Sequence, residues 1–223
     1  MRSTNDVKSQ AAATDEIDSL PGAPKLLSKH YSGFLSISVS KSIHYYYVES
    51  ERNPVSDSIV FWTNGGPGCS GLLGLFVELG PWRPQSDGSL VRNHHSWTSL
   101  ASIVFLEQPA GVGFSTTTNP KELETNDYNA ARDNVATIRE FFKRHPERAN
   151  NKMYLASESY GGHYVPQLTV ALLADKELSK NFGGFLLGNP YTSYASGDIA
   201  MAHTVWGLQL VDYPLWLEHY LGR

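Results

Sequence analysis

The sequence predicts an α/β fold, in which a largely parallel β-sheet is covered by helices and entered through an antiparallel hairpin. Short apolar runs, rich in branched and aromatic residues, recur at residues 58–63, 101–107, 152–157 and 184–189. Runs of this kind are typical of strands covered on both faces of a parallel sheet. Amphipathic segments lie between them, and this alternation of buried strands and helices indicates the α/β class.

The composition is that of an ordinary globular domain. The chain has 223 residues, of which 41% are hydrophobic, and a formal net charge of -4. This length suffices for one large core. No basic patch indicates a nucleic-acid partner, because the basic stretch at 143–148 ends a predicted helix, where cations complement the helix dipole. No apolar run approaches the roughly 20 residues of a membrane span, so we expect no membrane partner.

The first elements are a leader and a hairpin. Residues 1–24 are polar and end in LPGAP, which predicts a flexible leader outside the core. The leader lacks the apolar centre of a secretory signal, so the sequence does not predict a compartment. Residues 31–40 and 42–50 alternate apolar with polar side chains, which predicts a half-exposed antiparallel hairpin.

A long helix is predicted between the second and third apolar runs. From 125 to 145 the apolar side chains recur at steps of three and four and fall on one helix face, and Pro146 ends the pattern. These side chains are Tyr128, Ala131, Val135, Ile138 and Phe142.

The C-terminal part changes character after the last predicted strand. Residues 160–174 predict a helix directly after the strand at 152–157. Residues 198–210 and 213–222 are also helical in pattern and resemble an added cap more than further sheet elements. We therefore expect a core domain over 25–195 and the start of a helical cap over 196–223.

The segment SESYGGHY at 157–164 places Ser159 at a turn between a strand and a helix. A serine that acts as a nucleophile needs such a sharp turn, with a small residue two positions away on each side. The usual pattern is G-x-S-x-G, and here Ser157 replaces the first glycine. Taken alone the match is weak, since a serine and glycine turn without chemistry fits it equally well.

A glycine-rich loop strengthens this interpretation. The segment SIVFWTNGGPGCSG at 58–71 runs from a predicted strand into a predicted helix, which is where α/β-hydrolases take an amide of the oxyanion hole. We expect the backbone N–H groups of Gly66 and Tyr160 to be the two donors, each worth about 3 kcal/mol in the transition state. The alternatives are a plain glycine turn or a phosphate-binding loop. Neither Gly-Lys-Ser/Thr nor G-x-G-x-x-G is present, so no nucleotide cofactor is predicted, nor any metal.

Four collinear segments carry a family resemblance. WTNGGPGCSG, FVELGPW, FLEQPAGVGFS and SESYGGHYVPQL together resemble the serine carboxypeptidases, α/β-hydrolases that remove the C-terminal residue of peptides. The resemblance extends from about residue 24 to the C-terminus. It implies Ser159 as the nucleophile, Gly66 and Tyr160 as the oxyanion hole, and the C-termini of peptides or proteins as substrates.

The resemblance also implies a site for the free carboxylate of the substrate. A hydrogen-bonded carboxyl pair, matching Glu158 and Glu78, acts there with residues of the first segment, Trp62, Asn64 and Gly65. Two close carboxyl groups do not both ionise readily, so one keeps its proton and donates to the anion. Peptidase activity is then expected to favour acidic pH. Without the resemblance, Glu78 reads as a solvated helix residue and Asn64 as a turn former.

The sequence offers no convincing acid and base for Ser159. A hydrolase of this fold takes both from later in the chain. The candidate acids are Asp175, Asp198 and Asp212, and the candidate histidines are His163, His203 and His219. His163 lies on the helix after Ser159, and the others lie in the predicted cap. The family's C-terminal Asp and Gly-His segment has no counterpart, so we predict an α/β-hydrolase sheet truncated after about the sixth strand.

The single cysteine fits this interpretation. Cys69 has no partner in the chain, and the resemblance implies a disulfide to a downstream cysteine. The predicted partner is therefore the missing C-terminal segment, on the same or a separate chain. Family members usually act in vacuoles, in lysosomes or outside cells. Two alternatives are open: an inactive fragment or pseudo-enzyme that binds peptide C-termini, and an acyltransferase, although acyltransferases tend to alter the positions held here by Asn64 and Glu158.

Overall fold

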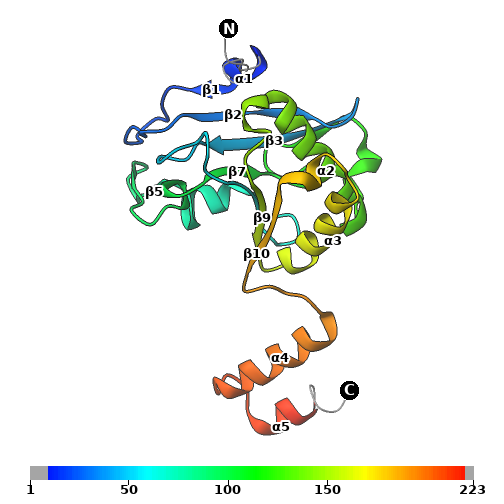
Figure 1. Cartoon of the computed structure of the whole chain (residues 1–223). Helices are drawn as coiled ribbons and strands as arrows, with labels where there is room; N and C mark the ends of the chain where they lie inside the picture. The colour runs from blue at the N-terminus through cyan, green and yellow to red at the C-terminus, as the bar shows by residue number, and fades with distance from the viewer. Residues whose placement is uncertain (1–9, 219–223) are drawn as a thin grey trace.

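The computed structural model describes residues 10–218, and a single sheet organises them (Figure 1). The sheet has eight strands in the order β1-β2-β3-β7-β4-β9-β10, and β8 pairs with β3. Strands β7, β4, β9 and β10 are parallel neighbours, whereas β1, β2, β3 and β7 pair antiparallel. The predicted α/β sheet entered through a hairpin is confirmed, although the sheet of the described residues has eight strands and not about six, since the sequence does not predict β1 and β8. The strands are β1 (Glu16–Ile17), β2 (His30–Ser36), β3 (Lys41–Val48), β4 (Ile59–Thr63), β7 (Ser102–Leu106), β8 (Thr116–Thr117), β9 (Met153–Glu158) and β10 (Phe182–Gly188).

Helices cover the sheet and extend beyond it. The long helix predicted over 125–145 is observed as α2, where the Asn126 side chain caps the first turn and Lys143 and Arg144 occupy the last. The helices are α1 (Gln10–Asp15), α2 (Asp127–Arg144), α3 (Gly161–Leu173), α4 (Tyr194–Gly207) and α5 (Tyr213–Trp216). Shorter helical turns are η1 (Gly74–Glu78), η2 (Trp97–Ser99), η3 (Pro120–Leu123), η4 (Pro146–Arg148) and η5 (Leu178–Asn181), and β5 (Trp82–Pro84) pairs with β6 (Leu90–Arg92).

Two apolar cores lie on opposite faces of the sheet. One packs strand side chains against α2 and α3 and includes Phe61, Val104, Leu155, Ile138 and Leu168. The other packs the alternate strand residues against η1 and β5 and includes Val60, Ile103, Ala156, Leu75 and Trp82. The central strands β4 and β7 are buried at every position, as their apolar runs predict.

The prediction of a half-exposed hairpin is wrong for its second strand. In β3 the last six residues are buried. Tyr45 and Tyr47 enter the core beneath α2, whereas Tyr46 and Val48 enter the opposite core. The cause is position, because β3 pairs with β2 on one side and β7 on the other and is covered on both faces.

The prediction of full burial is wrong for β10. This strand lies at the end of the strand order over residues 10–218, and Phe185 and Leu186 are 46% and 45% exposed. An apolar run predicts a strand that can be buried, but burial also requires a neighbour on each side.

The flexible leader predicted over residues 1–24 is corrected for residues 10–24. Strand β1 pairs with β2 and extends the sheet. The Asp15 carboxylate accepts a hydrogen bond of 2.8 Å from the Tyr45 hydroxyl, and the Trp82 indole N–H donates to the Pro24 carbonyl at 3.0 Å. Residues 10–24 are therefore held in place by contacts with residues far along the chain. Local composition does not reveal such contacts. Residues 1–9 lie outside the described part.

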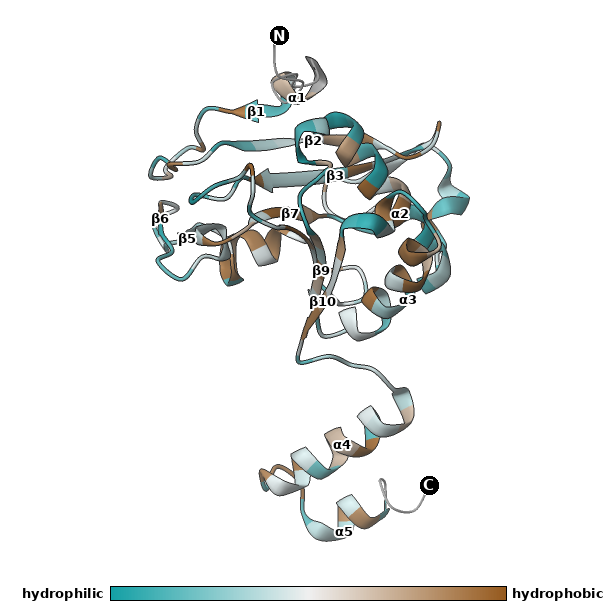
Figure 2. Cartoon of the chain, viewed as in Figure 1, coloured by the Kyte–Doolittle hydropathy of each residue, from teal (hydrophilic) through white to brown (hydrophobic). Residues whose placement is uncertain are grey.

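Helices α4 and α5 extend away from the sheet (Figure 1). In Figure 2 brown, hydrophobic stretches mark the central strands, and brown segments recur on α4 and α5 although these helices stand apart. The cap pattern predicts two helices over 198–210 and 213–222; α4 covers Tyr194–Gly207 and α5 covers Tyr213–Trp216, and the end of the second prediction lies outside the described residues. Within residues 10–218 no helix is both long enough and apolar enough to span a bilayer.

Candidate active site

Ser159 occupies a tight turn between the end of β9 and the start of α3. Its φ is 55°, in the left-handed region that a residue other than glycine rarely adopts. The Ser159 N–H donates to the Gly188 carbonyl at 3.0 Å, and the Ser159 carbonyl accepts from the N–H groups of Gly162 at 3.0 Å and Tyr191 at 2.7 Å. The residue is exposed and precedes the helix. The turn expected of a nucleophilic serine is therefore present.

The small residues around the turn have a steric reason. A Cβ atom on Gly161 would collide with the Ser157 side chain, so residue 161 has no room for one. Ser157 stands where the usual pattern has glycine, and its hydroxyl donates to the Thr63 carbonyl at 2.6 Å. The departure from the pattern thus adds a bond between the turn and the end of β4.

The glycine-rich loop after β4 lies against this turn. Strands β4 and β9 are parallel neighbours in register at Thr63 and Ser157, so the segments that follow them emerge at the same edge of the sheet. A Cβ atom on Gly65 would lie 2.5 Å from the Tyr160 nitrogen and 2.6 Å from the Glu158 carbonyl oxygen. Only glycine permits this approach. The loop that carries Gly66 and the turn that carries Tyr160 are in contact.

Asn64 joins the two carboxyl groups next to this contact. Its amide nitrogen donates to Glu78 Oε1 at 2.7 Å and to Glu158 Oε1 at 3.0 Å. Its amide oxygen accepts from the Trp62 indole N–H at 2.8 Å and from the Gly74 N–H at 3.1 Å. These four contacts fix the orientation of a side chain that is 1% exposed. The predicted carboxyl pair thus shares one amide, although Glu78 and Glu158 lie 80 residues apart in sequence.

Two effects raise the pKa of Glu78 above its ordinary value. Burial is the larger, and the neighbouring Glu158 carboxyl adds to it, while the hydrogen bond from Asn64 acts in the opposite direction. Glu78 therefore favours its protonated form more than an ordinary carboxyl group does, and a protonated carboxyl group can donate to an anion.

The Tyr160 side chain links the turn to two other helices. Its hydroxyl donates to Asp127 Oδ2 at 3.2 Å and lies 3.1 Å from the Tyr194 hydroxyl. The hydrogen bond with Tyr194 and burial raise the pKa of Tyr160, so the phenol stays protonated. Sequence reasoning missed Asp127 and Tyr194, because an aspartate in the first turn of a helix already has a role there.

The candidate acids have other partners. Asp175 forms an ion pair with Arg139, Asp198 accepts from the Tyr191 hydroxyl, and Asp212 caps α5. Each of these contacts is explained by local structure and does not involve Ser159.

The candidate histidines also lie elsewhere. His163 packs among the rings of Tyr160, Tyr191 and Tyr194, with centroids 4.8, 5.7 and 5.1 Å away. His203 lies 5.4 Å from the Trp216 ring, and His219 falls outside the described residues. Over residues 10–218 no histidine hydrogen-bonds the Ser159 hydroxyl, and no group of three or more His, Cys, Asp or Glu side chains could hold a metal ion.

Comparison with known proteins identifies one family, the serine carboxypeptidases. A family model described as serine carboxypeptidase matches residues 21–219. The lysosomal protective protein of Mus musculus is 42% identical over 204 residues, which cover 91% of this chain and 42% of that protein. Serine carboxypeptidase-like 45 of Arabidopsis thaliana is 39% identical over 205 residues, covering 89% of this chain and 44% of that protein.

A solved structure has the same fold. The chain superposes on a prohormone-processing carboxypeptidase, Kex1(Δ)p of Saccharomyces cerevisiae, with a TM-score of 0.78 and 24% identity, covering 91% of this chain and 48% of that one. The chain thus spans less than half the length of each of these three proteins.

Proposed function

Because the chain belongs to the serine carboxypeptidase family and has its α/β-hydrolase fold, we propose that it supplies the nucleophile, the oxyanion hole and the carboxylate site of a serine-type carboxypeptidase. The proposal is supported by one observation above all. The loop at residues 64–69 touches the Ser159 turn so closely that Gly65 has no room for a Cβ atom.

In the proposed reaction the Ser159 oxygen attacks the carbonyl carbon of the last peptide bond. The N–H groups of Gly66 and Tyr160 stabilise the resulting oxyanion. Collapse breaks the C–N bond, releases the C-terminal residue as its amine and leaves an acyl-enzyme on Ser159, which water then hydrolyses. The Ser159 proton passes to a histidine supplied from outside residues 10–218, and this histidine then gives the proton to the nitrogen of the leaving amine.

The carboxyl pair gives the proposed exopeptidase specificity. A protonated carboxyl group of the Glu78 and Glu158 pair donates a hydrogen bond to the free carboxylate of the substrate, and the Gly65 N–H is a second donor. The Trp62 indole N–H is already given to Asn64 at 2.8 Å, so Trp62 orients the amide. Since the pKa of Glu78 is raised, the pair loses its proton only as the pH rises, and peptide binding weakens in that direction.

The missing base is proposed to come from a C-terminal segment, on the same or another chain. Two observations support this. The chain spans 42% and 44% of the two curated relatives, and the apolar strand β10 offers an edge with Phe185 and Leu186 exposed. A further strand that pairs with β10 would cover this edge.

The test has two parts. The 223-residue chain alone is expected to give negligible release of the C-terminal residue from an N-blocked dipeptide at acidic pH. Release that Ser159→Ala abolishes would contradict the proposed missing base.

In a protein completed by the C-terminal segment, Glu158→Ala is expected to impair hydrolysis of the peptide far more than hydrolysis of an ester that lacks a free carboxylate. Equal losses on both substrates would remove the assigned carboxylate site, while Ser159→Ala is expected to abolish both.

A second function is binding of peptide C-termini without turnover. It is favoured by the lack of any histidine bonded to Ser159 over residues 10–218. Calorimetry of the chain with an N-blocked dipeptide and with its C-terminal amide separates the two functions, because binding through the carboxyl pair requires the free carboxylate. An acyltransferase is less favoured, since Asn64 and Glu158 are both retained.

A further inference from the structure

The segment FLEQPAGVGFS contains two buried polar residues that the proposed reaction does not use. Glu107 and Gln108 follow β7 directly, and each is 1% exposed. A buried carboxylate and a buried amide need partners, since an unpaired polar group in the interior costs about 1–3 kcal/mol or more.

Glu107 contacts the far end of the glycine-rich loop. The Ser70 hydroxyl donates to Glu107 Oε1, and the same hydroxyl oxygen accepts from the Leu72 N–H at 3.1 Å. The backbone is close here as well, because a Cβ atom on Gly71 would collide with the Leu106 carbonyl. Ser70 is therefore fixed to the segment that follows β7.

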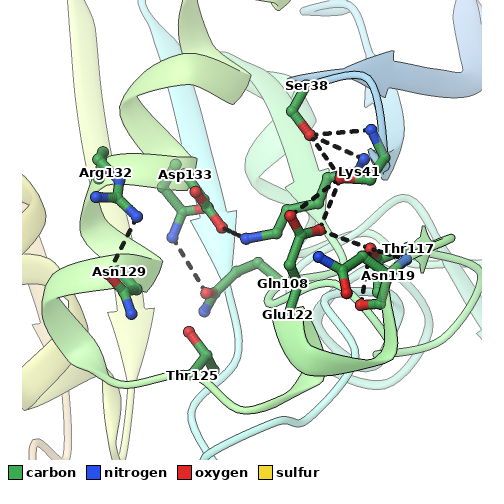
Figure 3. Close-up of polar contacts among 12 residues, drawn as sticks. Ser38, Lys41, Gln108, Thr117, Asn119, Glu122, Thr125, Asn129, Arg132 and Asp133 are labelled. Carbon is green, nitrogen blue, oxygen red and sulfur yellow. Dashed lines mark hydrogen bonds and ion pairs between the residues drawn. The ribbon is translucent and has the colours of Figure 1, made fainter.

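Gln108 contacts the near end of the same loop. Its amide nitrogen donates to the Thr63 hydroxyl at 3.0 Å, and its amide oxygen accepts from Asn134 of α2 at 3.1 Å. In Figure 3 Gln108 lies beside α2, and a dashed line joins its side chain to that helix. Thr63 is the last residue of β4, and its carbonyl accepts the Ser157 hydroxyl. This end of the loop is therefore tied to α2 and to the Ser159 turn.

The Glu107 carboxylate is itself held in place. The Phe114 N–H donates to Oε2 at 2.9 Å, and His44 Nδ1 lies 2.9 Å from the same oxygen. A Cβ atom on Gly113, whose φ is 55°, would collide with the carboxylate, so glycine lets the loop wrap around it. Burial alone would raise the pKa of Glu107, but the contacts from His44, Ser70 and Phe114 lower it, so the group is an anion that accepts from Ser70 and Phe114 and lies beside the His44 ring.

His44 continues this network without forming a second nucleophilic site. Its Nε2 atom lies 2.8 Å from the Ser32 hydroxyl, so Ser32, His44 and Glu107 follow the order of a serine, histidine and acid relay. Ser32 lies in the middle of β2, paired with Tyr46, and lacks the sharp turn that exposes a nucleophile. His44 therefore orients the carboxylate.

From these contacts we propose that Glu107 and Gln108 are positioning residues that clamp both ends of the loop at residues 64–69, and so hold the Gly66 N–H and the Asn64 side chain against the Ser159 turn. The proposal rests on the proposed function for its catalytic meaning. An oxyanion donor is effective only when its position is fixed before the reaction, and loss of one donor costs roughly 100-fold or more in rate.

The chain contains a reporter for this clamp. Cys69 is its one cysteine and lies in the loop between the two clamped ends. Its rate of reaction with a chromogenic disulfide reagent, measured on the folded 223-residue chain, reports how often the loop opens. Ser70→Ala and Gln108→Ala are each expected to raise this rate about tenfold, as loss of one buried hydrogen bond implies. Ser70→Ala leaves Glu107 in its remaining contacts, so the protein is expected to fold.

Two controls separate positioning from general stability. Glu122 also accepts side-chain hydroxyls, from Ser40 and Thr117, but at the tip of the β2–β3 hairpin (Figure 3). Glu122→Gln is expected to leave the Cys69 rate unchanged. Val135→Ala weakens the core beneath α2 and is expected to lower the unfolding free energy without changing that rate. A Cys69 rate that is unchanged in Ser70→Ala and Gln108→Ala, or raised equally by Val135→Ala, overturns the proposal.

The catalytic consequence is measured in a protein completed by the C-terminal segment. There Ser70→Ala is expected to lower kcat for an ester about tenfold per titrated Ser159, with KM little changed. If the completed wild-type protein is inactive, the proposed function fails, and the Cys69 rate still decides whether the clamp exists. If the Cys69 rate rises while kcat per titrated site is unchanged, the clamp does not position the oxyanion hole, and the proposal is overturned.

Discussion

Helices α2 and α4 each contain eight apolar residues, α2 among 18 and α4 among 14, but the two helices have very different surroundings. Helix α2 buries seven of its 18 residues against the sheet and α3, whereas α4 buries only Ala202 among its 14. On α4 the side chains of Ile199 and Met201 are 58% and 63% exposed. The difference shows that α2 belongs to the packed core, whereas most apolar side chains of α4 stay exposed within residues 10–218.

The candidate site belongs to the region of the packed sheet, and not to α4 and α5. Ser159, Asn64 and the glycine-rich loop are held by the parallel strands β4 and β9 and by segments directly after them. Tyr191 and Tyr194, which lead into α4, are the link between the two regions, through the Ser159 carbonyl and the Tyr160 hydroxyl. We therefore expect the Ser159 turn to keep its geometry even where α4 and α5 are loose.

The largest expected contrast in stability is between apolar side chains of the two helices. Phe141 on α2 is fully buried and packs edge to face on Tyr47 and Phe61 at 5.2 and 5.3 Å. Phe141→Ala is expected to lower the unfolding free energy by about 3–5 kcal/mol, because it removes this packing and leaves a cavity. Ile199→Ala on α4 is expected to change it by less than about 0.5 kcal/mol. Urea unfolding of the chain measures both, and similar losses would remove the contrast.

The next contrast is between two glycines. Gly65→Ala places a methyl group 2.5 Å from the Tyr160 nitrogen, and backbone atoms cannot rotate away, so we expect a loss of about 3 kcal/mol or more. Gly207→Ala in α4 meets no atom within 4 Å, and a gain of up to about 1 kcal/mol is expected from the higher helix propensity of alanine. Thermal unfolding compares the two. A harmless Gly65→Ala would mean that the loop does not press on the Ser159 turn.

The sequence predicts the elements of the site better than their supports. The Ser159 turn and the loop carry local signals, because glycine and serine at fixed spacing reflect steric limits within a few residues. The hydrogen bonds that hold these elements in place join distant positions. Examples are Glu107 with Ser70, 37 residues apart, and Asp127 with Tyr160, 33 residues apart. The grouping of Asn64, Glu78 and Glu158 is predicted only through a family resemblance.

The errors in burial have one cause. An apolar run indicates that a strand can be covered, but its neighbours decide whether it is. Strand β3 gains partners on both sides and is buried, whereas β10 has a partner on one side within the described residues and is partly exposed. The same reasoning applies to the leader, where β1 finds a partner in β2.

A smaller effect concerns the protonation of the site. Glu78 has a raised pKa in the folded chain, so its contribution to stability is complete below the ordinary carboxyl pKa and is lost as the pH rises through the raised one. The unfolding free energy of the wild type relative to Glu78→Gln is therefore expected to fall as the pH rises above the ordinary carboxyl pKa of about 4.3.

Glu122 provides the control of opposite sign. Hydrogen bonds from Thr117 and Ser40 lower the pKa of Glu122, so its contribution is present above the ordinary pKa and is lost as the pH falls. The unfolding free energy of the wild type relative to Glu122→Gln is expected to rise with pH up to the ordinary carboxyl pKa and to stay level above it. Urea unfolding at several pH values gives both slopes, and a flat or rising slope for Glu78→Gln would argue against a shared proton in the carboxyl pair.

The smallest effect on global stability is expected for Trp216. Its ring is 6% exposed and stacks on Trp206 at 4.5 Å, with Tyr213 at 5.9 Å, so it joins α5 to α4 and not to the sheet. Trp216→Ala is expected to change the unfolding free energy of the core by less than about 0.5 kcal/mol, because the substitution removes no contact with the sheet.

Locally the effect of Trp216→Ala is expected to be large. Loss of the stacked pair frees α4 and α5 from each other, so limited proteolysis at residues 208–212 should accelerate about tenfold, as loss of roughly 1.4 kcal/mol of local stability implies. Cleavage in the loop at residues 64–69 is expected to stay at the wild-type rate. If Trp216→Ala instead lowers the core stability as much as Phe141→Ala does, the two regions unfold as one cooperative unit, and the Ser159 turn depends on the helices that follow it.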